Sequence, residues 1–330
     1  MREALDKVSG AVATKTIVPA LTHYLVRDGF IHASNGHITA AAPFPCADTF
    51  AVVARNFEDV LRRLPDPVKL TLDDPKWIQL TARRCRGRVA RNATIEGGFL
   101  GPTGEEIAAP ANLVDKMRVM RPFISDNASQ PFATCLCLNG SHMYATNNVA
   151  LVVTDDAGLP DKFYAMVNCF AVDYILSRKE KLTHLQHDAG SISFFWSDGS
   201  WMRSQLLDIK FPAIEAIVDT AADPDFELTD EWKAAFDTAA AVAESCVRIY
   251  ADRIVGGSGA IADSPNTNNA EVEVECTSPV PEDRDHTAWH PKFLAPVIAA
   301  ANYWKPEVFP KPAPFAGDEV YGVILGRTND

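Results

Sequence analysis

The 330-residue sequence lacks the patterns that mark most catalytic sites. Its cysteines and histidines show no zinc-site spacing and no H-E-x-x-H pattern. The glycine-rich stretch at 256–259 is not followed by the Lys-Ser/Thr pair of a phosphate-binding loop. No nucleophile-elbow motif occurs either. We therefore expect no catalytic activity, no metal and no cofactor, with an unrecognised hydrolase kept as a remote alternative.

The chain also lacks the marks of export and of membrane insertion. Its seven cysteines are scattered and odd in number, which indicates reduced thiols and not a disulfide framework. The N-terminal segment is charged and has no signal-peptide apolar core, and no apolar run reaches membrane-spanning length. These features predict a cytoplasmic protein with no membrane partner.

A basic excess is missing as well. Lysine and arginine total 31 against 43 acidic residues, which gives a formal net charge of −12. Such a balance favours solubility and argues against a surface that binds nucleic acid everywhere. It leaves open a local basic face, because net charge says nothing about distribution.

What the chain does contain is a threefold repeat. Short apolar-periodic helices begin near Phe57, Phe170 and Phe293, spaced too widely for a solenoid repeat. Each is preceded by another helix and by alternating strands, with turns such as Asn35-Gly36 and Asn139-Gly140 between them. The pattern predicts three tandem α+β domains over residues 1–103, 104–221 and 222–330.

The helices of this repeat can be placed from periodicity and from their end signals. We expect them over residues 2–9, 56–64, 111–121, 168–179, 229–244 and 291–302. Four prolines between Pro306 and Pro314 predict a stiff connector near the C-terminus.

Two residue pairs invite a chemical reading and are better explained by structure. Asp73-Asp74 and Asp155-Asp156 lie at strand ends, where adjacent side chains point to opposite faces, so solvated turns explain them best. Cys135 and Cys137 share one strand face without a second metal-binding pair, which indicates a buried apolar role.

Basic residues recur on the predicted helices. For any single helix an ordinary solvated face is the simpler interpretation. Their recurrence on equivalent helices of an acidic chain instead favours a basic stripe that contacts phosphates and not base edges. The cations are Arg2, Lys7, Arg55, Arg62, Arg63, Lys116, Arg118, Arg121, Arg178, Lys179, Lys233 and Lys292.

Four segments resemble the bacterial DNA polymerase sliding clamps, the beta subunit family. Residues 4–12 and 17–21 are similar to the opening of that family. Residues 145–151 stand where the family has Ala-Thr-Asp-Gly-His-Arg-Leu, and residues 204–212 resemble its Lys-Leu-Val-Asp-Gly-Arg-Phe-Pro segment. The likeness covers nearly the whole chain in order and spacing.

The resemblance implies three clamp domains per chain, with antiparallel sheets outside and helices lining a central pore. Two chains would join head to tail as a homodimer ring that encircles duplex DNA without sequence specificity. The ring would be a non-enzymatic processivity factor that tethers a DNA polymerase and is opened by a clamp loader. The basic residues above would line the pore. The alternative is a scaffold that keeps the fold and binds partner peptides without encircling DNA.

The resemblance also implies two protein-binding surfaces. A peptide pocket would be formed by apolar and small polar residues of the second and third domains: Phe132, Thr146, Asn148, Val149, Ala150, Leu151, Phe211, Pro212, Ala216, Ile217, Val323, Ile324, Leu325 and Arg327. The dimer interface would join late strands of the first domain to the end of the third domain's first helix: Ile78, Leu80, Val89, Ala241 and Val242.

Two departures indicate a divergent member, of cellular or viral origin. Val149-Ala150 replaces the family's His-Arg pair, so we expect a more apolar pocket. The segment after Ala301 is shorter than in the family, which leaves open whether the third domain has lost a strand.

Overall fold

The computed structural model describes residues 1–92, 95, 99–126, 129–213, 217–218, 223–257, 270–280 and 284–327. These residues form two compact units. Unit 1 comprises residues 1–114 and 170–208, and unit 2 comprises residues 115–169 and 209–330. Each unit is described by itself below.

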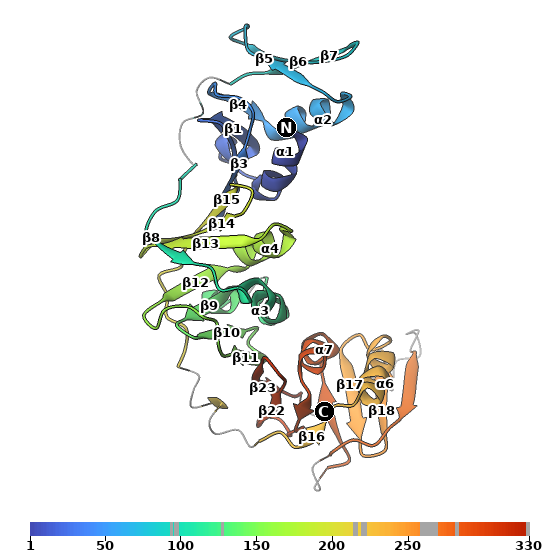
Figure 1. The fold of residues 1–330 in the computed structure, drawn as a ribbon. Coiled ribbons are helices and arrows are strands. Elements are labelled where there is room, and N and C mark those ends of the chain that lie inside the picture. The colour runs from blue at the N-terminus through green and yellow to red at the C-terminus, as the bar shows by residue number, and fades with distance from the viewer. Residues whose placement is uncertain are drawn as a thin grey trace. The chain divides into compact units, whose positions relative to one another are not determined.

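Unit 1 is built on an eight-stranded antiparallel sheet in the order β4-β1-β2-β3-β15-β14-β13-β8. Figure 1 shows its N-terminal strands beside strands from much later in the chain. The two halves join where β3 pairs with β15, as in Thr39 opposite Arg203. The strands are β1 (His23–Arg27), β2 (Phe30–Ser34), β3 (Ile38–Pro43), β4 (Phe50–Val53), β8 (Glu105–Ala108), β13 (Leu182–His187), β14 (Ser191–Trp196) and β15 (Trp201–Gln205).

Unit 2 repeats this topology in the order β12-β9-β10-β11-β23-β22-β21-β16. Its two halves join where β11 pairs with β23, with Leu151 opposite Val323. The strands are β9 (Cys135–Asn139), β10 (His142–Thr146), β11 (Ala150–Thr154), β12 (Tyr164–Asn168), β16 (Phe226–Glu227), β21 (Tyr303–Trp304), β22 (Pro312–Ala316) and β23 (Tyr321–Leu325).

Two smaller antiparallel sheets complete the described strands. Unit 1 contains the sheet β5-β6-β7, and unit 2 contains the sheet β19-β18-β17-β20. Both have open edge strands, β7 and β19, whose outer backbone groups pair with no strand of the described residues. Their strands are β5 (Lys69–Thr71), β6 (Trp77–Ala82), β7 (Cys85–Ala90), β17 (Cys246–Tyr250), β18 (Arg253–Gly257), β19 (Glu271–Glu275) and β20 (His286–Trp289).

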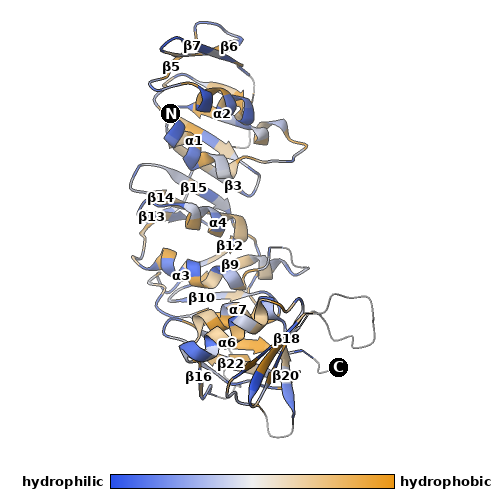
Figure 2. Ribbon diagram, turned by 90° about the vertical axis from the view of Figure 1, so that its right-hand side faces the viewer, coloured by the Kyte–Doolittle hydropathy of each residue, from blue (hydrophilic) through white to orange (hydrophobic). Residues whose placement is uncertain are grey.

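All six predicted helices are present, with bounds that differ from the predictions by a few residues. They are α1 (Arg2–Val8), α2 (Ala54–Arg63), α3 (Leu113–Met120), α4 (Cys169–Ser177), α6 (Asp230–Ala240) and α7 (Pro291–Ala300). Each is amphipathic enough to bury one side: α1 packs on β2 and β3, and α6 packs on β18 and β19. Figure 2 shows hydrophilic and hydrophobic stretches on the same helix in α2 and α3. None of the described helices has the length and hydropathy needed to span a membrane.

The internal repeat extends to single turns. Between β2 and β3, the Asn35 side chain accepts hydrogen bonds from two backbone amides, and Gly36 has φ 90°. Between β10 and β11, Asn147 makes the same pair of bonds and Asn148 has φ 70°. Asparagine tolerates this left-handed conformation better than most residues, so the second turn keeps its shape without glycine.

The end of the proline-rich segment forms a strand, so the predicted connector was wrong for Pro312 and Pro314, whereas Pro306 and Pro310 lie in the connection between β21 and β22. β22 contains Pro312 and Pro314 yet pairs with β23 along its whole length. The carbonyl of Pro314 accepts a hydrogen bond from Lys305 on the β21 side, so the missing N–H groups face that side. Because β21 has only two residues, few ladder bonds are lost. Strands β21, β22 and β23 follow α7, so the third repeat has its three late strands.

The compact units cut across the predicted second domain. Its strand β8 and its late strands β13, β14 and β15 belong to the unit 1 sheet, whereas β9, β10, β11 and β12 belong to the unit 2 sheet. The division therefore follows the two continuous sheets and not the sequence repeat. The boundaries at 103 and 221 stay a prediction.

Candidate functional site

An apolar pocket of about 430 Å³ opens in unit 2. Two neighbouring strands, β11 and β23, provide one wall, and the segment around Phe211 provides the other. Its lining residues are Phe132, Thr146, Asn148, Val149, Ala150, Leu151, Phe211, Pro212, Ile217, Pro312, Val323 and Leu325. The wall offers one hydroxyl and one side-chain amide among aliphatic and aromatic groups, so the pocket suits an apolar ligand.

The rim of the pocket is a tight hairpin turn shaped by side-chain hydrogen bonds. Thr146 donates to the carbonyl of Ala150 at 2.8 Å and accepts from the amide of Asn148 at 3.1 Å. Asn147 accepts from the amides of Val149 and Ala150 at 3.1 and 2.8 Å. These bonds satisfy backbone groups locally and hold Val149 at the pocket's edge.

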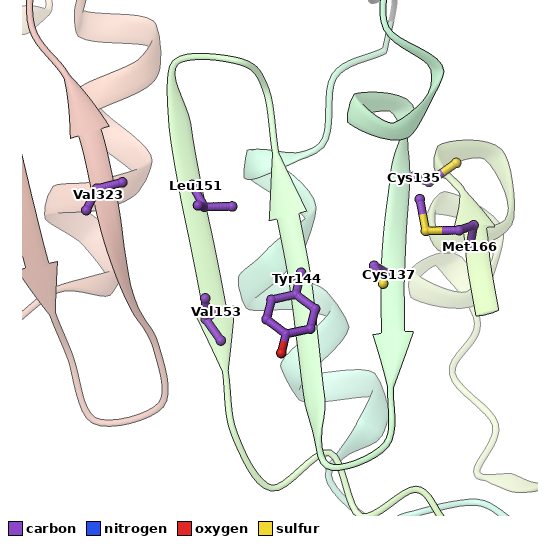
Figure 3. Close-up of a cluster of buried hydrophobic side chains, with 7 residues drawn as sticks. All are labelled: Cys135, Cys137, Tyr144, Leu151, Val153, Met166 and Val323. Carbon is purple, nitrogen blue, oxygen red and sulfur yellow. The ribbon is translucent and has the colours of Figure 1, made fainter. Parts of the chain in front are cut away.

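The pocket lies against a buried cluster on one face of the unit 2 sheet (Figure 3), to which its lining residues Leu151 and Val323 belong. Leu151 and Val153 of β11 lie between Val323 of β23 and Tyr144 of β10, and two thiols come from β9. The Phe211 ring stacks on the Tyr144 ring with 5.8 Å between ring centres, and it meets the Phe132 ring edge-on with 6.0 Å between ring centres. Such aromatic contacts add to the energy of area burial and fix the wall in place.

The two thiols of this cluster are inert. Cys135 and Cys137 are buried, as the sequence predicted. Burial raises the pKa of Cys135 to about 11 and that of Cys137 to about 12. Both therefore remain protonated near neutral pH and carry no nucleophilic thiolate. No group of metal-binding side chains occurs among the described residues.

Most of the predicted pocket residues line this pocket, and three do not. Ala216 lies outside the described residues. Ile324 is 1% exposed and alternates with Val323 and Leu325, so it points to the opposite face of β23 and belongs to the core. Arg327 donates to the carbonyl of Ser245, away from the pocket lining. The predictions of a pocket role for Ile324 and Arg327 were wrong in this respect.

Pro312 is the lining residue that sequence reasoning missed. Its register opposite Leu325 places it beside the pocket. The proline run masked the strand, and the five apolar residues 312–316 show no polar/apolar alternation that would have revealed it.

A second, polar cavity of about 620 Å³ shares Asn148 with the apolar pocket. Two of the predicted pore cations, Arg121 and Lys292, line it. Arg121 is held by Asp126 at 2.5 Å, whereas Lys292 is exposed beside Phe293.

The predicted pore cations fall into three groups. Four are exposed with no ion pair to a described residue: Arg55, Arg63, Lys179 and Lys292. Two are about half exposed in surface ion pairs with Asp6 and Asp115, namely Arg62 and Arg118. The rest are tied to protein groups: Arg2, Lys7, Lys116, Arg121, Arg178 and Lys233.

Lys116 and Arg178 are the least accessible of these cations. Lys116 is 6% exposed and donates to the carbonyl of Asp155 at 2.5 Å. The Arg178 side chain is 5% exposed and pairs with Asp198 at 3.1 Å. A buried amine or guanidinium that is already paired has no free donor for a phosphate, so neither can contact one in this conformation.

Arg178 belongs to a buried ion cluster in unit 1. Lys7 reaches Asp198 at 2.8 Å, and the Arg178 guanidinium lies 4.8 Å from the centre of the Trp196 ring. Burial alone would raise the pKa of Asp198, but hydrogen bonds from Lys7 and Ser200 lower it to about 2. This cluster joins α1 to the β14-β15 hairpin and stabilises unit 1.

The predicted interface residues of unit 1 are core residues. Ile78 and Leu80 are fully buried and Val89 is 4% exposed, with β7 packed beneath α2. They offer no exposed surface in a single copy, and their role at an interface stays a prediction. Ala241 is exposed and Val242 partly exposed at the end of α6.

The open edge strands β7 and β19 carry exposed side chains of opposite charge. β7 and the turn before it expose Arg84, Arg86 and Arg88. β19 has the sequence EVEVE, with all three glutamates exposed and both valines turned inward. Charge on an edge strand also discourages unwanted pairing, so either strand alone is ordinary.

Comparisons with known proteins fit this geometry. No family model matches the sequence, and no curated protein matches it. Among solved structures, the DNA polymerase sliding clamp from Bacillus subtilis matches with a TM-score of 0.79 and 14% identity, over 99% of this chain and 97% of that chain. The Caulobacter crescentus beta sliding clamp matches with a TM-score of 0.79 and 16% identity, over 98% of this chain and 96% of that chain. The Helicobacter pylori beta clamp bound to a DNA ligase peptide matches with a TM-score of 0.75 and 13% identity, over 98% of this chain and 96% of that chain.

The chain therefore has the sliding-clamp fold along nearly its whole length, as the resemblance predicted. Identities this low show the fold alone, so function has to be argued from the site.

Proposed function

We propose that the chain is a DNA sliding clamp, a ring of two copies that encircles duplex DNA and holds replication proteins through its apolar pocket. The observation that carries the proposal is the apolar pocket at the β11-β23 junction of a clamp fold. In this account the chain has no catalytic role. A DNA polymerase and a clamp loader are its expected partners.

Peptide binding is the best-supported part of the proposal. The pocket is large enough for one or two aliphatic or aromatic anchors of a short peptide. The Helicobacter pylori clamp was solved with a DNA ligase peptide, so a clamp of this fold can bind one. Val149 and Ala150 offer no charged group, and we expect binding here to depend mainly on apolar burial.

The test is a fluorescein-labelled peptide with leucine and phenylalanine anchors, measured by anisotropy. Leu151→Ala and Leu325→Ala each remove a lining side chain and should weaken binding by about 1–3 kcal/mol. Ile324→Ala is the matched control, because Ile324 lies on the opposite face of β23. It should lower stability and leave affinity unchanged. Equal losses in all three variants would contradict the pocket assignment.

Ring closure in this proposal rests on the edge strands β7 and β19. We propose that β7 of one copy pairs with β19 of the next, with arginines facing glutamates. Strand addition satisfies the open backbone groups, and opposite charge fixes the partner and register. Such a contact is heterologous, so it closes a ring only when its rotation fits.

A charge swap tests this contact. Arg84→Glu with Arg86→Glu, and separately Glu271→Lys with Glu275→Lys, should each leave the chain monomeric. An equimolar mixture should form a heterodimer, because both of its contacts then pair opposite charges. Lys69→Glu on the other edge of the same small sheet is the control and should remain dimeric. Dimers of either double variant alone would contradict the proposed interface.

DNA contact in the proposal falls to the exposed cations. Arg55, Arg63, Lys179 and Lys292 are free to bind phosphates, which predicts weak binding to duplex of any sequence with strong salt dependence. Changing one of them to glutamate should reduce the slope of log K against log salt by about one. Lys162→Glu, an exposed lysine outside the set, is the control.

The scaffold alternative has one observation in its favour. Six of the twelve predicted pore cations are tied to protein groups, which leaves fewer for phosphate. A scaffold would bind the peptide, remain a monomer of 36.0 kDa and show no salt-dependent affinity for duplex. The mass in solution therefore separates the two accounts.

A further inference from the structure

Tyr164 has a role that neither the pocket lining nor the sequence reveals. It stands on the edge strand β12, 37% exposed, in the same sheet as β11 and β23. Its hydroxyl accepts a hydrogen bond from the amide of Phe211 at 2.8 Å and donates to the carbonyl of Ile209 at 3.3 Å. One hydroxyl thus bridges two backbone groups of the segment that carries the pocket wall.

That segment has little else to hold its backbone. Residues 206–213 form neither helix nor strand. Between Ile209 and Phe211 the backbone makes two hydrogen bonds to described residues, and both are with the Tyr164 hydroxyl. The Phe211 side chain is positioned separately, by its stacking on Tyr144 and its edge contact with Phe132.

We infer that Tyr164 is a positioning residue that fixes Phe211 as the pocket wall before a peptide arrives. This inference rests on the proposed peptide-binding function. A wall ordered in advance spares the ligand the entropy of ordering it, so affinity is higher without any contact between Tyr164 and the peptide. The partner it serves is a peptide whose apolar side chain packs against the Phe211 ring.

The variant Tyr164→Phe tests this because it removes only the hydroxyl and keeps the ring. Tyr303→Phe is the matched control, since Tyr303 is an exposed tyrosine of the same unit whose hydroxyl bonds to no described residue. Amide hydrogen exchange of Phe211 should be about 3- to 10-fold faster in Tyr164→Phe than in wild type, as expected for the loss of one hydrogen bond. The control should match wild type.

The second readout is the fluorescein-labelled peptide with leucine and phenylalanine anchors. Its Kd should rise about 3- to 10-fold in Tyr164→Phe, mostly through faster dissociation, while the melting temperature stays close to wild type. Unchanged exchange at Phe211 would overturn the inference, and so would faster exchange with unchanged affinity. Failure of the wild-type chain to bind the peptide would instead contradict the proposed function, since the exchange experiment reads the Tyr164 contact without any ligand.

Discussion

Gly322 is the position where a single added methyl group should damage the pocket most. β23 approaches β11 so closely there that a Cβ atom would lie 2.0 Å from the carbonyl oxygen of Leu151. It would also lie 3.0 Å from the Phe315 ring. Contacts below 3.0 Å do not occur for real Cβ atoms, so the two strands must separate by about 1 Å at the pocket wall.

The cost can be estimated from this overlap. Overpacking a buried site usually costs about 1–3 kcal/mol. We expect Gly322→Ala to fall at the upper end, because the obstructing atom is backbone and cannot rotate away. The β11-β23 hydrogen bonds beside Leu151 should weaken, and peptide affinity should fall with them.

Urea denaturation and peptide anisotropy measure the two effects. Gly257→Ala is the control, since it is also a strand glycine of unit 2 and its Cβ would meet nothing closer than 3.7 Å. The control should not lower the free energy of unfolding, and reduced entropy of the unfolded chain should raise it by up to about 1 kcal/mol. A Gly322→Ala variant as stable as this control, with unchanged peptide affinity, would refute the close approach of the strands.

Two further predictions concern unit 1. Burial lowers the pKa of His32 to about 4, below its usual 6.5. As the pH falls, the unfolded chain is therefore protonated at this histidine before the folded chain is. The free energy of unfolding should decrease between pH 6.5 and 4 by on the order of 2–3 kcal/mol. Urea titrations at several pH values measure this dependence. His32→Gln should remove the fall in the free energy of unfolding with falling pH, whereas the control His37→Gln should keep it. The same pH dependence in wild type and both variants would refute the assignment. Asp198→Asn should cost about 1.5–3 kcal/mol, because Lys7 and Arg178 lose a charged hydrogen-bond acceptor while Arg178 keeps its ion pair with Glu180 at 2.9 Å. A cost below 1 kcal/mol would mean that the cluster contributes little.

Local patterns were enough to predict the elements of the fold. Helix periodicity and end signals placed all six helices, and Asn35-Gly36 and Asn139-Gly140 marked two hairpin turns correctly. The composite sheets were harder to predict, because the pairing of β3 with β15 joins residues far apart in sequence and no local pattern encodes it. That pairing explains why the compact units do not follow the repeat.

The pocket shows the same limit at single-residue scale. Resemblance placed Val323 and Leu325 at the site, yet it also placed Ile324 there, although neighbours on one strand face opposite ways. Lys116 shows a signal that was overlooked. It falls on the apolar stripe of α3 formed by Leu113, Met117 and Met120, which indicates a residue turned inward. Its burial could therefore have been predicted from spacing alone.

Single-particle electron microscopy of the purified chain at low micromolar concentration tests the central claim most directly. A sliding clamp predicts closed rings with a central opening, each with the mass of two 36.0 kDa chains. Single-chain particles without an opening, seen at a concentration where the peptide still binds, would contradict the ring and favour the scaffold.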